Sequence, residues 1–271
     1  AGVVDRKRDA RHTAAAFGVL LLASYVFRLP PLLNARSTNS DAAVVGLQAM
    51  HILRGEHGAF LWGSGYQTAA DAYAAAAFFR LGGATPLVLM LSALTLHVVA
   101  TALVFATLRR RLTPWTALLL TAPLVLSPSS VHTYALYPPR QLAITLAIGA
   151  FWAIHGASRG SRLRADAWIA LGGLLYGLAV SADPYPMVLA PVLFGYGLLV
   201  AFERPARRLA SLLLGLATGL VPFVLLHQAP QSRRGPMGLS LGAVGHNWDL
   251  LVRECLPWAL SYKVYFAHHV M

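Results

Sequence analysis

Three acidic residues stand where a carboxylate could take part in a reaction. Asp41 follows a polar stretch, 34–40, and begins an apolar helical run. A carboxylate there suits a general base that accepts a proton from a hydroxyl group, although an acid in the first turn also simply complements the helix dipole. Asp71 lies in a second helical run, where a solvated helix acid is the favoured interpretation. Asp183 precedes a proline between two apolar runs, where a site residue and a turn former are equally good interpretations.

Two arginines are candidates for binding a phosphate group. Arg140 follows Tyr137-Pro138-Pro139 and begins an apolar run, and Arg80 lies near the end of the helical run that contains Asp71. A guanidinium group holds phosphate through forked, charge-assisted hydrogen bonds, whereas contact with lipid headgroups is the plainer alternative. Arg140 is the stronger candidate because it stands at a helix start, and Arg80 would assist it.

A divalent metal ion is the cofactor left open by the sequence. His51, His57 and His132 could join Asp41 or Asp71, since imidazole and carboxylate groups suit Zn²⁺ or Mn²⁺. No HExxH or His-x-His spacing supports such a site. The single cysteine, Cys255, excludes an internal disulfide and a cysteine-based zinc site. Walker and GxSxG motifs are also missing, which argues against an ATP-driven machine or a soluble-type hydrolase.

Composition indicates which elements must position these residues. Of the 271 residues, 57% are hydrophobic and 12% are charged, against about 25% charged in an average soluble domain. The formal net charge is +12, but the basic residues form short clusters at the ends of apolar runs. We therefore predict an all-α, polytopic membrane protein in contact with the lipid bilayer and no nucleic-acid partner.

About seven spans can be drawn, and they organise a transmembrane module over residues 1–230. Their approximate bounds are 14–30, 85–108, 114–129, 140–157, 166–182, 184–202 and 209–228. Residues 231–271 are expected to begin an amphipathic extracytoplasmic segment of a longer protein. Basic clusters occur at 6–11, 109–111, 159–164 and 204–208. The positive-inside rule then places the N-terminus in the cytoplasm and the loop 31–86 outside.

Two surface helices are predicted in this outer loop, at 41–54 and 67–81. In the first, Gln48 lies about 20° and His51 about 80° from Asp41 on a helical wheel. Between the helices comes an aromatic loop that includes Tyr66. We expect Gln48, His51, Tyr66 and Asp183 to line the same site as Asp41.

The order of these features resembles the GT-C superfamily of membrane glycosyltransferases. The specific likeness covers 28–83: Arg28-Leu-Pro30, then Asn39-Ser-Asp41, then a helix that ends in His51-Ile-Leu-Arg-Gly55, and then Phe60-Leu-Trp-Gly63-x-x-Tyr66. The chain is most similar to the protein-mannosyltransferase and lipid-A aminoarabinose-transferase branch, whose N-terminal module has seven spans. In that family an acidic residue of the first outer loop is required for transfer, and Asp41 is the matching position.

The resemblance implies transfer of a sugar from a polyprenyl-phosphate donor to an extracytoplasmic acceptor, with Asp41 as a catalytic residue. Asp71 is the second catalytic candidate. It also implies an integral protein of the bacterial inner membrane and cell envelope. A non-enzymatic subunit or assembly factor of a larger membrane complex remains the alternative. A transporter ranks third, because His97 is nearly the only polar candidate near the middle of a span.

Overall fold

The chain is helical throughout the part described by the computed structural model, which comprises residues 3–36, 38–126, 135–157, 162–200, 205–227 and 241–256. This confirms the all-α prediction for those residues. Their only pairing of strand type is an isolated antiparallel bridge between Phe60 and Thr68. The helices, in chain order, are α1 (Val3–Val26), α2 (Leu29–Leu33), α3 (Ser40–Leu53), α4 (Ala70–Gly82), α5 (Pro86–Arg109), α6 (Pro114–Val125), α8 (Gln141–Gly156), α9 (Arg162–Ala182), η2 (Tyr185–Leu189), α10 (Ala190–Val200), α11 (Pro205–His227), α12 (Leu241–Leu250) and η3 (Leu251–Cys255).

Among the described residues, three helices are long and apolar enough to cross a membrane: α5 over Pro86–Arg109, α9 over Arg164–Ala182 and α11 over Ala206–Leu226. They coincide with three of the seven predicted spans. Shorter apolar helices, Pro114–Val125, Gln141–Gly156 and Tyr185–Leu199, cover three more. α1 has 24 residues, but its first half is rich in charged residues. The structure thus supports an integral membrane protein, and the count of seven spans stays a prediction.

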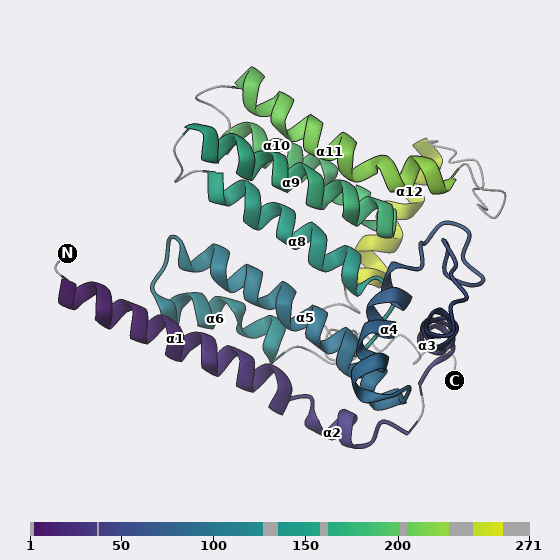
Figure 1. Ribbon diagram of the computed structural model, residues 1–271. Coiled ribbons are helices and arrows are strands. Elements are labelled where there is room, and N and C mark those ends of the chain that lie inside the picture. The colour runs from purple at the N-terminus through teal and green to yellow at the C-terminus, as the bar shows by residue number, and fades with distance from the viewer. Residues whose placement is uncertain are drawn as a thin grey trace.

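The long helices form two groups that lie side by side (Figure 1). One group contains α1, α5 and α6, and the other contains α8 to α11. Contacts between α5 and α8 join them. Each group has its own apolar core, centred on Leu20 and Phe105 in the first group and on Ile154 and Ile169 in the second.

Helices α9 and α11 pack through glycines at intervals of four residues, which place them on one face of each helix. A Cβ atom added at Gly173 would lie 2.2 Å from the carbonyl oxygen of Leu212, and one at Gly215 would lie 2.0 Å from that of Ala170. A Cβ atom at Gly177 or Gly219 would lie 2.6 Å or 2.3 Å from an opposing backbone oxygen. Small residues at this spacing let two helices approach at backbone distance, as in many membrane helix pairs.

Helices α3 and α4 lie together at one end of the bundle (Figure 1). Their shared core includes Val45, Ala49, Ala72 and Ala76, and it packs on Leu89 at the start of α5. α3 begins one residue earlier than predicted, with the Asn39 side chain accepting from the backbone N–H of Ala42 at 2.8 Å.

α4 begins three residues later than the predicted start at Gln67, because the chain before it is held in other contacts. Thr68 pairs with Phe60, and both its backbone N–H and its hydroxyl donate to the carbonyl of Ala182 at 3.0 Å. The loop is therefore fixed to the end of α9. Beyond α11, only 241–256 of the predicted segment 231–271 belongs to the described residues, and it forms α12 and η3.

Candidate functional site

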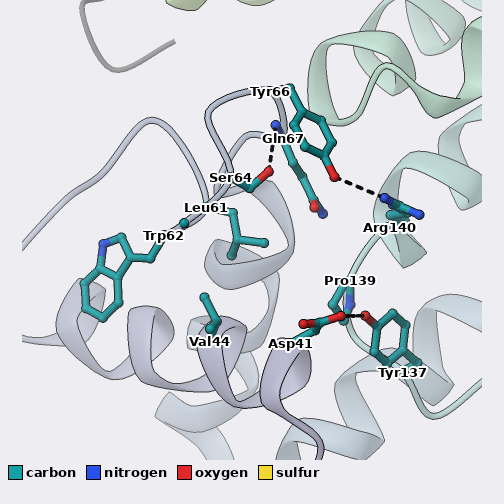
Figure 2. Close-up of a pocket in the computed structure, with 11 residues that line it drawn as sticks. Asp41, Val44, Leu61, Trp62, Ser64, Tyr66, Gln67, Tyr137, Pro139 and Arg140 are labelled. Carbon is teal, nitrogen blue, oxygen red and sulfur yellow. Dashed lines mark hydrogen bonds between the residues drawn. The ribbon is translucent and has the colours of Figure 1, made fainter. Parts of the chain in front are cut away.

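A cavity of about 420 Å³ lies at the end of the bundle occupied by α3 and α4. α3 contributes Asp41 and Val44, the aromatic loop contributes residues between Leu61 and Gln67, and the segment before α8 contributes Tyr137, Pro139 and Arg140 (Figure 2). Its volume falls within the range of about 300–1,000 Å³ that is typical of small-molecule sites. The sequence elements that form it are up to about one hundred residues apart.

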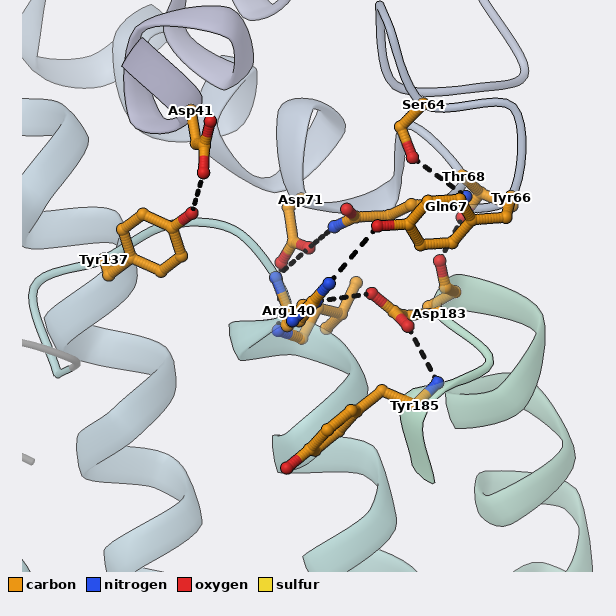
Figure 3. A network of polar contacts seen from close by, with 12 residues as sticks. Asp41, Ser64, Tyr66, Gln67, Thr68, Asp71, Tyr137, Arg140, Asp183 and Tyr185 are labelled. Atoms are coloured by element: carbon orange, nitrogen blue, oxygen red, sulfur yellow. Dashed lines mark hydrogen bonds and ion pairs between the residues drawn. The ribbon is translucent and has the colours of Figure 1, made fainter. Parts of the chain in front are cut away.

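Asp41 has an exposed carboxylate at the edge of this cavity. It lies in the first turn of α3, where the partial positive charge of the helix N-terminus favours an anion. The hydroxyl of Tyr137 donates to its Oδ2 at 2.7 Å (Figure 3). This bond orients the carboxylate toward the segment that leads to Arg140. Asp41 is predicted by the sequence, whereas Tyr137 is not, although its position three residues before Arg140 was a usable signal.

Asp71 is buried behind the cavity and does not line it. Its carboxylate accepts the backbone N–H groups of Arg140 at 2.7 Å and of Leu142 at 3.0 Å, and the side-chain amide of Gln67 at 3.4 Å (Figure 3). Asp71 thus supplies the cap that the N-terminus of α8 otherwise lacks. Burial raises the pKa of Asp71 to about 6, and the Asp183 charge adds to this, while the hydrogen bonds from Leu142, Arg140 and Gln67 oppose it.

Arg140 joins the cavity to two buried acids. Its φ of 72° lies in the left-handed region, and it is the only non-glycine residue with positive φ among the described residues. This conformation is costly for a residue with a Cβ atom, and the two contacts to Asp71 and Asp183 hold it in place. The guanidinium Nε donates to Asp183 Oδ2 at 3.0 Å, and Nη2 donates to the hydroxyl of Tyr66 at 3.3 Å. The ring of Tyr185 lies 5.6 Å from the guanidinium carbon.

Asp183 is at once a turn former and a partner of Arg140. Its Oδ1 accepts the backbone N–H of Tyr185 at 2.8 Å, which closes the Asp-Pro turn, and its Oδ2 accepts from the arginine. Only 2% of its side chain is exposed. Asp183 therefore forms the turn and holds Arg140, and it is not one of the residues that line the cavity. Tyr185 is not predicted as a site residue by the sequence, and this turn places its ring beside Arg140.

The other predicted residues have different surroundings. Tyr66 lines the cavity, whereas buried Gln48 supports the loop behind it by donating to the Phe60 carbonyl at 2.8 Å. The Gln48 side chain also accepts the backbone N–H of Trp62 at 3.2 Å. His51 does not line the cavity. Arg80 is exposed and lies nine residues after Asp71, about 13 Å along α4, so the structure does not bring it to Arg140.

The histidines that suggested a metal ion have other neighbours. His51 Nδ1 lies 2.7 Å from Glu56 Oε2, and this contact lowers the pKa of the glutamate. His57 Nδ1 lies 3.2 Å from the hydroxyl of Tyr73, and His132 lies outside the described residues. Within the described ranges, no group of three His, Cys, Asp or Glu side chains is arranged to hold a metal ion.

The cavity therefore presents an exposed carboxylate and a fixed guanidinium, which come from different helices. Such a pair can accept a proton from one reacting group and stabilise negative charge on another. Comparison of the chain with known protein families, curated proteins and solved structures finds no match to any of them.

Proposed function

We propose that the chain is a GT-C-type membrane glycosyltransferase, which moves a sugar from a polyprenyl-phosphate donor to an extracytoplasmic acceptor. The observation that carries the proposal is that Asp41 and Arg140 line one cavity of about 420 Å³. The likeness of 28–83 to that superfamily supplies the substrate class. The cavity offers a carboxylate for the acceptor and a guanidinium group for the donor phosphate.

Asp41 acts on the acceptor in this proposal. Its carboxylate takes the proton of an acceptor hydroxyl as that oxygen bonds to the anomeric carbon of the sugar. The bond from the anomeric carbon to the phosphate oxygen breaks, and its electron pair leaves with the polyprenyl phosphate. The configuration at the anomeric carbon is inverted. Tyr137 holds the carboxylate in one orientation through its 2.7 Å hydrogen bond.

Arg140 acts on the donor. Its side chain is 36% exposed although its partner Asp183 is buried, so it can contact a phosphate at the cavity while it remains paired. The charge of the departing phosphate is then stabilised by a group that is already in place, which needs little reorganisation during the reaction. Asp71 fixes the backbone of Arg140 and so acts as a positioning residue.

The proposed placement in the membrane follows from the ends of the helices. α5 ends at Arg109, and α11 begins near Arg207 and Arg208, at the end of the bundle opposite to α3 and α4 (Figure 1). With basic ends in the cytoplasm, the N-terminus is cytoplasmic, α3 and α4 lie on the outer surface, and seven helical segments span a bacterial inner membrane.

The test uses the full chain in nanodiscs with a polyprenyl-phosphate-linked sugar and membrane extract as the source of acceptor. We expect the wild type to release polyprenyl phosphate, detected by mass spectrometry. Asp41→Asn should reduce release by at least about 100-fold, within the range for a general base, and should leave the thermal unfolding temperature nearly unchanged. His51→Gln is the matched control on the same helix, outside the cavity.

Full activity of Asp41→Asn would refute the assigned role of this carboxylate. If the wild type binds no polyprenyl phosphate and copurifies in fixed proportion with a larger complex, the proposed enzyme is wrong and the chain is a non-enzymatic subunit.

A further inference from the structure

The arginine run that ends α5 has three side chains with different surroundings. Arg109 forms an ion pair with Asp9 of α1 and donates from Nε to the hydroxyl of Thr13 at 3.0 Å. The charge of Arg109 is therefore balanced within the protein, between α5 and α1.

Arg110 lies against α8 and α9 on the other side of α5. Its guanidinium carbon is 5.1 Å from the ring centroid of Trp152 and 5.9 Å from that of Trp168. Nη1 also donates to the carbonyl of Trp152 at 3.0 Å. Contacts with aromatic faces orient a cation and leave its formal charge unchanged.

Arg111 is the exposed member of the run. Its side chain makes no hydrogen bond or ion pair with any residue in the part of the chain that the structure describes. Its backbone N–H donates to the carbonyl of Leu108 at 3.0 Å, so Arg111 lies within one turn of Leu108, just beyond the end of α5. A positive charge is therefore presented at the end of α5 that contains Leu108.

An apolar groove of about 240 Å³ includes Leu108, the residue whose carbonyl accepts the backbone N–H of Arg111. Its α5 wall is made of Val104, Thr107 and Leu108, and its α8 wall of Ile148 and Phe151. The ring of Phe151 lies 6.4 Å from that of Tyr196, so the α8 wall of the groove packs toward α10. Helices α5 and α8, which form its two walls, are neighbours in the bundle (Figure 1).

We propose that this groove binds one anionic phospholipid, with an acyl chain between α5 and α8 and the headgroup phosphate on Arg111. The apolar walls exclude a soluble anion as the whole ligand, and the adjacent arginines favour an acidic over a zwitterionic headgroup. Basic positions between membrane helices at a cytoplasmic face bind acidic lipids in this way. The site is independent of the proposed transferase activity, because it lies at the other end of the bundle from the cavity.

Native mass spectrometry of the full chain tests this proposal. The purified protein is given equal amounts of phosphatidylglycerol and phosphatidylcholine with identical acyl chains, and retained lipid is counted. We expect one phosphatidylglycerol to be retained in preference. Arg111→Gln should lower this preference about five-fold, the contribution of one basic residue beside an acidic lipid. Arg109→Gln is the matched control and should keep the preference, because Arg109 is already paired with Asp9.

A second pair of variants tests the acyl-chain part. Val104→Phe fills the groove from α5 and should reduce retention of phosphatidylglycerol, whereas Leu119→Phe, on the exposed face of α6 outside the groove, should not. Equal retention of both lipids by the wild type overturns the proposal. So does an equal loss in Arg109→Gln and Arg111→Gln, which would indicate a general charge effect, or unchanged retention in Val104→Phe.

Discussion

The ion pair between Arg140 and Asp183 is buried on one side only. The two side chains are joined at 3.0 Å, yet 36% of the arginine is exposed and only 2% of the aspartate. The loss of stability should therefore depend on which of the two charges is left unpaired. This asymmetry yields a quantitative prediction that does not depend on the substrate.

Arg140→Gln should be the more destabilising single change. It leaves the Asp183 carboxylate without its counter-charge in a site shielded from water, and breaking a buried pair in this way costs about 3–5 kcal/mol. Glutamine is preferred to glycine, because glycine would also relieve the left-handed backbone at φ 72° and so mask part of the loss.

Asp183→Asn should cost less, about 1–2 kcal/mol. It removes a charge-assisted hydrogen bond, for which a loss of about 1.5–3 kcal/mol is typical, but the partly exposed arginine can turn toward solvent and recover part of this loss. The asparagine oxygen can still accept the backbone N–H of Tyr185, which keeps the turn.

The assay is reversible unfolding of the purified chain in a mild detergent, with both single variants and the double variant compared at pH 7.5. The double variant should be more stable than Arg140→Gln alone, since it no longer contains an unpaired buried carboxylate. Equal losses in the two single variants, or additive losses in the double variant, would refute the unequal burial on which this prediction rests.

Two further predictions concern stability. Folding raises the pKa of Asp71 from 3.8 to about 6, so the folded state binds more protons than the unfolded state between these pH values. The free energy of unfolding should therefore rise as pH falls, by about 1 kcal/mol from pH 7 to pH 5. Asp71→Asn should lack this part of the pH dependence in parallel unfolding titrations. A flat profile in the wild type, or an identical slope in Asp71→Asn, would contradict the assignment. Gly215→Ala should separate α9 from α11, because its Cβ would lie 2.0 Å from a backbone oxygen, and should lower the unfolding temperature by more than about 5 °C. Gly195→Ala is the control, because Gly195 has open space around it. Equal unfolding temperatures for the two variants would show that the close approach of the two helices is wrong.

Much of the local structure could be predicted from the sequence, because it depends on neighbouring residues. The apolar runs predict α5, α9 and α11 within a few residues, since burial of continuous apolar side chains and internal backbone pairing both favour a helix in a membrane. The polar stretch before Asp41 predicts the start of α3, since the Asn39 cap acts over three residues. The same pattern selected Asp41, and Arg140 was selected by its place before an apolar run.

The roles of the selected residues were decided by the tertiary structure. Asp71 and Arg140 are separated by 69 positions, and no local pattern shows that one caps the helix that the other begins. Tyr137 likewise reaches Asp41 across 96 positions. The spacing of the glycines in α9 and α11 is visible in the sequence, but the sequence does not show that these two helices pack on each other. Periodicity determines which face of a helix is polar or small. Only packing determines what that face meets, and so which carboxylate is buried as a cap and which stays exposed at the cavity.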